Sequence, residues 1–108
     1  MKGLPILLVA IAFEVFGSTA LRLADGFRHL GWAAASLFGF TVALGLLSVA
    51  MRHLPLGVSF ATWAGVGTAG AVAVGVWLFG ERLAPLQLLA VAVILGGVGL
   101  LHLSAPKP

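Results

Sequence analysis

Four long apolar runs, separated by short clusters of charged residues, divide the chain. They cover residues 4–21, 30–51, 54–80 and 83–104, and Glu14 is the one Asp, Glu, Lys or Arg inside them. Each run is close to or above the roughly 20 helical residues that cross a hydrocarbon core of about 30 Å. Backbone groups in lipid must be paired within their own segment, so helices are expected. The runs also lack the polar-apolar alternation of barrel strands. The pattern predicts an all-α integral membrane protein with four transmembrane helices.

The connections between the runs are short and carry turn or helix-start residues. Asp25-Gly26 in the first connection is a turn signal. Pro55 follows the second connection and Pro85 the third, at positions where a helix can begin. These lengths leave no room for a soluble domain, so we expect a single four-helix transmembrane domain over residues 1–108.

Composition excludes a water-soluble fold. Of the 108 residues, 61% are hydrophobic and 8% charged, whereas soluble domains carry about 25% charged residues. The six basic residues are dispersed and form no stripe that could follow a nucleic acid. There is no cysteine, and His29, His53 and His102 lie far apart, so neither a metal site nor a cofactor is expected. Nothing in the chain suggests an enzyme.

Positive charges are balanced between the two sides of the membrane. With four spans, both termini and the second connection share one side, and the first and third connections share the other. Each side then holds three Lys or Arg residues: Lys2, Arg52 and Lys107 on one, Arg22, Arg28 and Arg82 on the other. Because the count of Lys and Arg sets orientation, it gives no bias here. One interpretation is chance; the other is a chain that inserts both ways and pairs with its inverted copy.

Glu14 is the strongest functional candidate. A charge at mid-span costs at least about 2.5–3.5 kcal/mol, and such residues commonly mark proton or ion pathways. The alternative is a protonated side chain that only joins helices. Its neighbours one turn away include Ala10, Gly17 and Ser18, which leave space for a ligand or for another helix. Glu14 can hold a proton or an external cation but not both, which suits an exchange mechanism.

The third run carries aromatic residues and glycines at helical spacing. Phe60, Trp63 and Gly67 share one face. Trp63 lies at mid-depth, where it either packs in the core or offers a cation–π surface to an organic cation. Gly65 and Gly67 either permit close helix packing or form a bend.

These residues resemble those of the small multidrug resistance transporters of bacteria over nearly the whole chain. The matching segments are Phe13-Glu14-Val15, Asp25-Gly26-Phe27, Leu54-Pro55-Leu56-Gly57, 61–67 and Phe79-Gly80-Glu81. The resemblance implies proton-coupled export of cations across the inner membrane by an antiparallel, dual-topology homodimer, or by a pair of paralogous chains.

The resemblance also implies residue roles. Glu14 would bind proton and substrate, and Trp63 would line the pocket. Gly65 and Gly67 would form a hinge, and Ala90 and Gly97 would pack the dimer. The family's pocket tyrosines fall here on Leu4, Phe40 and Phe60, and the chain has no tyrosine. The predicted pocket therefore comprises Trp63, Phe60, Ser18, Ala10, Gly17 and Phe40.

Two branches of this family bear on the substrate. The guanidinium-exporting branch carries a tryptophan one turn after the key glutamate, where this chain has Gly17. We therefore predict a proton antiporter for hydrophobic quaternary ammonium ions. The alternatives are a guanidinium or polyamine exporter of the same family, and a membrane scaffold subunit that transports nothing.

Overall fold

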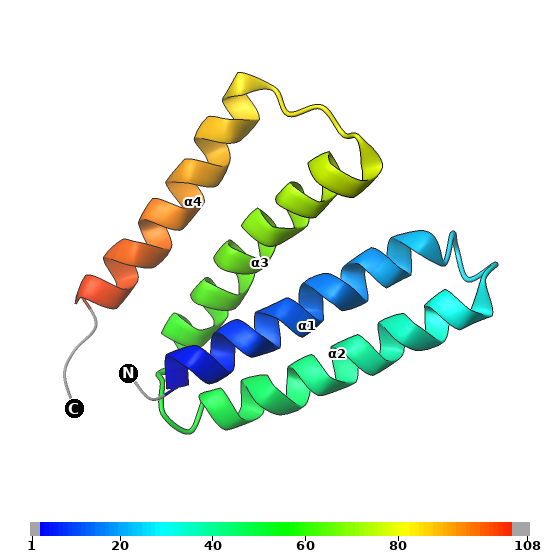
Figure 1. The fold of residues 1–108 in the computed structure, drawn as a ribbon. Helices are drawn as coiled ribbons and strands as arrows, with labels where there is room; N and C mark the ends of the chain where they lie inside the picture. Colours follow the sequence, from blue (N-terminus) through cyan, green and yellow to red (C-terminus); the bar gives the residue numbers. More distant parts are fainter. Residues whose placement is uncertain (1–2, 105–108) are drawn as a thin grey trace. The chain divides into compact units, whose positions relative to one another are not determined.

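Four α-helices account for the regular structure of the part of the chain that the computed structural model describes, residues 3–104. They are α1 (Gly3–Leu23), α2 (Leu30–Ala50), α3 (Leu56–Phe79) and α4 (Pro85–Ser104), shown in Figure 1. Their ends differ from the apolar runs by one or two residues at most. Lys2 and Lys107 of the charge count lie outside the described range.

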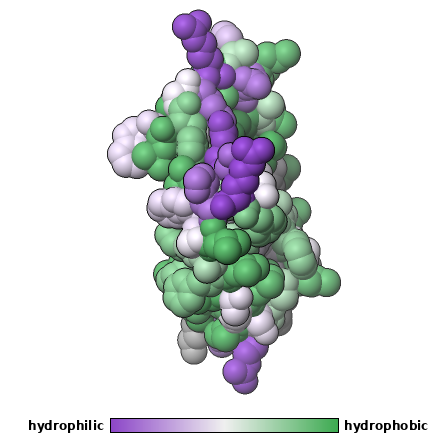
Figure 2. All heavy atoms as spheres, turned by 90° about the vertical axis from the view of Figure 1, so that its right-hand side faces the viewer, coloured by the Kyte–Doolittle hydropathy of each residue, from purple (hydrophilic) through white to green (hydrophobic). Residues whose placement is uncertain are grey.

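All four helices are long and apolar enough to cross a membrane. Each has 20 to 24 residues, which at about 1.5 Å per residue spans roughly 30 Å or more. Figure 2 shows that hydrophobic side chains cover most of the face in view, with hydrophilic residues gathered in a few places. The predicted fold class, an all-α multi-pass membrane protein, is confirmed.

The chain divides into two compact units, Met1–Leu54 and Pro55–Pro108. Each unit is a helical hairpin: α1 with α2 in the first, and α3 with α4 in the second. The boundary falls at Pro55, which precedes the first residue of α3 in extended conformation with φ −60° and ψ 152°. Proline fixes such a φ and lacks the N–H that a helix start leaves unpaired, so α3 begins directly after it.

The first hairpin is held together by small side chains. The buried residues of α2 recur every three or four positions, as expected for one helical face; they are Ala33, Ser36, Gly39, Ala43, Leu47 and Ala50. At Gly39 the two backbones approach closely: a Cβ there would lie 2.8 Å from Phe16 Cδ2 and 3.0 Å from Gly17 Cα. Close approach through glycine is the usual packing mode of membrane helices.

The turn between α1 and α2 has three consecutive left-handed residues. Asp25, Gly26 and Phe27 have φ values of 50°, 66° and 68°. The His29 N–H donates to the Ala24 carbonyl oxygen at 3.1 Å and closes the turn. The predicted Asp25-Gly26 turn is therefore confirmed. Left-handed φ is rare for a bulky residue, so Phe27 is the strained member of the three.

The second hairpin is joined at two levels. A Cβ on Gly65 would overlap Val98 and lie 3.2 Å from Ile94 Cγ2, so α4 fills the space that the missing side chain leaves. Nearer the start of α3, Thr62 Oγ1 lies 2.7 Å from His102 Nε2 in a hydrogen bond. At the end of α3, the Glu81 N–H donates to the Gly75 carbonyl oxygen at 3.1 Å. The left-handed Gly80, with φ 63°, allows the chain to turn there.

Helix α4 differs from the other three because none of its residues is buried. Ile94, Val98 and His102 face α3 through the contacts above, and most of its other residues are apolar and exposed. A helix that is apolar all round is suited to lipid or to a further helix.

Candidate functional site

Glu14 lies in the middle of α1, eleven residues after Gly3 and nine before Leu23. Its side chain is half-buried, and its Oε2 is buried without a hydrogen-bond partner. Polar atoms removed from water are normally paired, and the exceptions call for an explanation. This carboxylate is therefore the chemically unsatisfied group of the first hairpin.

The residues one turn from Glu14 are mostly enclosed. Ala10 and Gly17 are buried and Ser18 is half-buried. Gly17 faces Phe40 of α2: a Cβ on Gly17 would lie 3.3 Å from Cγ and Cδ1 of that ring. The structure thus brings together Gly17 and Phe40 from the predicted pocket set, in the same hairpin as Glu14.

Two aromatic residues of the predicted pocket, Phe60 and Trp63, lie on α3, in the other unit. Trp63 is half-buried, Gly67 is buried and Phe60 is 53% exposed. Two hydroxyl residues beside them, Ser59 and Thr62, are fully buried. The α3 face therefore combines an accessible aromatic surface with buried hydroxyls.

The residues of the predicted hinge and dimer contact have distinct surroundings. Helix α3 is continuous through Gly65 and Gly67, and Gly65 packs on α4. The hinge therefore stays a prediction. The structure adds that Gly65 packs closely against α4. Ala90 and Gly97 lie exposed on α4, and nothing in the described residues comes within 4 Å of a Cβ built on Gly97.

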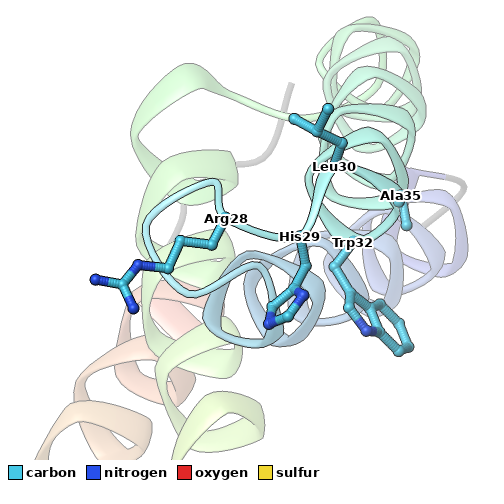
Figure 3. A pocket seen from close by; sticks show the side chains of 6 residues that line it. Arg28, His29, Leu30, Trp32 and Ala35 are labelled. Atoms are coloured by element: carbon cyan, nitrogen blue, oxygen red, sulfur yellow. The ribbon is translucent and has the colours of Figure 1, made fainter.

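Two hollows mark the surface of the first hairpin. The larger, about 680 Å³, lies at the start of α2 between residues 28 and 35 and includes Arg28, His29 and Trp32 (Figure 3). In Figure 3 the Arg28 side chain points away from the Trp32 ring, and its Nη1 lies 3.9 Å from Asp25 Oδ2 in an exposed ion pair. The smaller hollow, about 320 Å³, is apolar and lined by Ala12, Phe13, Phe16 and Phe38. Neither is lined by Glu14.

Two features of the structure were not anticipated from the sequence. The Thr62–His102 hydrogen bond joins residues 40 positions apart, and the pattern of the chain alone does not give the register of two apolar helices. The close approach at Gly39 had a weak signal, since Gly17 and Gly39 are glycines near the middle of adjacent runs. Of the histidines, His29 and His53 are exposed in connections and His102 is half-buried.

Comparison with known proteins gives a consistent family assignment. Residues 3–94 match the family model described as Small Multidrug Resistance protein. Multidrug resistance protein EbrB of Bacillus licheniformis is 43% identical over 102 residues, covering 94% of this chain and 86% of the relative. The guanidinium exporter of Salmonella typhimurium is 37% identical over 100 residues, covering 93% and 95%. Multidrug resistance protein EbrA of Bacillus subtilis is 36% identical over 100 residues, with the same coverage.

The apolar helices and these relatives agree with the family expected from Phe13-Glu14-Val15 and the segments that follow it. The protein is a multi-pass protein of the bacterial inner membrane and a transporter rather than an enzyme. The chain belongs to the small multidrug resistance family.

Proposed function

We propose that the protein is a proton-coupled antiporter that exports hydrophobic organic cations of the quaternary ammonium type from the cytoplasm. The observation that carries this proposal is Glu14, a carboxylate at the middle of a membrane-spanning helix with an unpartnered buried oxygen. An uncompensated charge at this depth is costly, so the carboxylate requires either a proton or a positively charged ligand. The two ligands exclude each other, and this competition couples their movements across the membrane.

The aromatic residues of α3 support an organic cation as the ligand. Trp63 is half-buried and Phe60 is more than half exposed, so both present ring surface. Cations are attracted to aromatic faces, most strongly to tryptophan, and the attraction grows when the cation loses water. Alkylammonium ions lose water more readily than small hydrated ions, so these side chains favour apolar cations.

The packing at Gly17 supports the quaternary ammonium branch over the guanidinium branch. Relatives of this chain are named both as multidrug resistance proteins and as guanidinium exporters, so identity alone does not separate the branches. Family resemblance places a tryptophan at this position in guanidinium exporters. Here even a Cβ on Gly17 would lie 3.3 Å from the Phe40 ring, so an indole would require Phe40 to move.

An antiparallel homodimer completes the proposal. The equal Lys and Arg counts on the two sides favour insertion in both orientations. Helix α4 has no buried residue and exposes Ala90 and Gly97, small residues that permit close contact with a second helix. The family also includes proteins named EbrA and EbrB, so a pair of paralogous chains is the alternative assembly.

Transport by the purified protein in liposomes tests the substrate class. With a pH gradient imposed, we expect proton-coupled currents with tetrapropylammonium and benzalkonium-type ions, and small or absent currents with guanidinium. The bulky ions can desolvate onto Trp63 and Phe60, whereas guanidinium requires a network of hydrogen-bond acceptors. Currents with guanidinium and with no other cation would overturn the assignment to the quaternary ammonium branch, but the exchange mechanism would stand. If the protein reconstituted alone gave no current with any cation, this result would count against the homodimer.

Labelling of single cysteines from each side of the membrane tests the dual topology. The chain has no cysteine, and His29 and Ser104 are exposed residues outside and at the end of the helices. In a dual-topology population, His29→Cys and Ser104→Cys are each expected to react with an impermeant maleimide at about half of the copies from either side. Full reaction of one variant and none of the other, from the same side, would establish a single orientation and rule out the antiparallel homodimer.

A further inference from the structure

Six hydroxyl side chains of the described helices differ in their hydrogen bonding. In four of them the hydroxyl donates to the carbonyl oxygen four residues earlier in its own helix, a common arrangement in membrane helices. These four bonds, of 2.5 to 2.8 Å, are made by Thr19, Thr41, Thr68 and Ser104. Ser59 and Thr62 differ, since neither hydroxyl bonds to the backbone of its own helix.

The hydroxyls of Thr62 and Ser59 differ in their hydrogen bonding. Thr62 is 2% exposed, and its hydroxyl is bonded to His102 of α4 at 2.7 Å. Ser59 is 0% exposed, and its Oγ has no hydrogen-bond partner. The Thr62 hydroxyl is thus already paired with His102, and the Ser59 hydroxyl is the unpaired group in this part of α3.

Ser59 lies beside the aromatic face of α3. It precedes Trp63 by four residues, so the two side chains are neighbours on the helix surface. At 100° per residue, Ser59 falls between Trp63 and Thr62 around the helix axis. An unpaired hydroxyl next to a cation–π surface is suited to a ligand that carries both a positive charge and a hydrogen-bonding group.

We propose that Ser59 is a specificity-determining residue whose hydroxyl bonds a polar substituent of the transported cation. The substrate class then includes ammonium ions that carry a hydroxyl or carbonyl group, and not solely hydrocarbon cations. This inference rests on the proposed function, because it assumes that the cation sits against Trp63. It requires this face of α3 to open when the cation binds, as alternating access demands of a central site.

Burial makes the Ser59 hydroxyl a strong discriminator. A surface hydroxyl would exchange a bond to water for a bond to substrate, with little net gain. The Ser59 hydroxyl has no such bond to lose, so a polar substituent is favoured over an apolar one of equal size. Sites with a buried hydrogen-bonding group reject the analogue that lacks the matching partner for the same reason.

Two cations of nearly equal shape test this directly. Triethyl(2-hydroxyethyl)ammonium and triethylpropylammonium differ by a hydroxyl in place of a methyl group. In liposomes containing the wild-type protein, we expect the hydroxylated ion to have the lower KM. In Ser59→Ala, the ratio of the two KM values should shift by about threefold to tenfold toward the hydrocarbon ion, the range of one neutral hydrogen bond. Transport of triethylpropylammonium itself should persist.

Two control variants separate this role from loosened packing. Thr68→Val removes a hydroxyl of the same helix that is already bonded to the Ala64 carbonyl oxygen, so the KM ratio should not change. Thr62→Val breaks the bond to His102 and should alter both KM values in the same direction. If Ser59→Ala does not fold, Ser59→Cys keeps the size with a weaker hydrogen-bonding group and should show the same shift.

The outcomes distinguish the subsite from the transport mechanism. An unchanged KM ratio in Ser59→Ala or Ser59→Cys, with both ions still transported, would overturn the role of Ser59 and leave the antiporter standing. Failure of the wild-type protein to transport either ion would overturn the proposed function and the subsite with it.

Discussion

Replacement of Glu14 by glutamine is expected to reduce proton-coupled cation transport to the background of empty liposomes. Glutamine has nearly the same size and can make the same packing contacts, but it neither carries a charge nor exchanges a proton at neutral pH. Glu14 is half-buried in the middle of α1, and the four apolar runs contain no other Asp, Glu, Lys or Arg that could take over its role. The measurement is the current, or the change in internal pH, when a quaternary ammonium ion is added to liposomes with a pH gradient.

The matched control for Glu14→Gln is Asp25→Asn. It makes the same chemical change, a carboxylate to an amide, in an exposed turn outside the helices. Asn accepts a left-handed φ at least as well as Asp, so transport should be retained. Coupled transport by Glu14→Gln at the wild-type rate would refute the exchange mechanism. Under the scaffold alternative, the glutamine variant would support whatever cellular role the wild type has.

Replacement of Gly39 by valine is expected to disrupt the first hairpin. A Cβ at this position would lie 2.8 Å from Phe16 Cδ2 and 3.0 Å from the backbone of Gly17. The ring can turn aside, but the backbone of α1 cannot move without separating the two helices. Overpacked sites typically cost about 1–3 kcal/mol, and the added valine methyl groups place this one at the upper end. The free energy of unfolding, from helical circular dichroism during titration with a denaturing detergent, provides the measurement.

Gly45→Val in the same helix is the control for Gly39→Val. Nothing in the described residues lies within 4 Å of a Cβ at Gly45, and the change in intrinsic helix propensity is the same. A difference between the two variants therefore reports packing alone. If Gly39→Val were as stable as Gly45→Val, the close approach of α1 and α2 would be wrong.

The four helices could be predicted because charge is confined to their ends. Glu14 is the single exception, and it was predicted to be the functional residue for the same reason. Helix ends were less predictable: α3 begins at Leu56 rather than at residue 54 because Pro55 sets the start. The tight approach at Gly39 depends on which residues of two apolar helices face each other, and hydropathy does not distinguish the faces.

The candidate site residues could be chosen by residue type, but their contacts could not be predicted. Gly17 stood out as a small neighbour of Glu14, yet its contact with Phe40 depends on the hairpin register. Likewise, the bond between His102 and Thr62 depends on how far α4 is shifted along α3. Single hydrogen bonds between apolar helices are set by packing, which local sequence does not encode.

The open surface of α4 has a consequence for how such proteins diverge. Substitutions on the buried face of α2 are tested by the stability of the chain itself, whereas α4 has no buried residue and meets α3 at Ile94, Val98 and His102. Exposed positions of α4 are therefore expected to tolerate substitution in a single chain, and in the proposed dimer they would be selected through the partner. After a gene duplication, two copies could drift apart on this helix and come to prefer each other, while both keep the same hairpins.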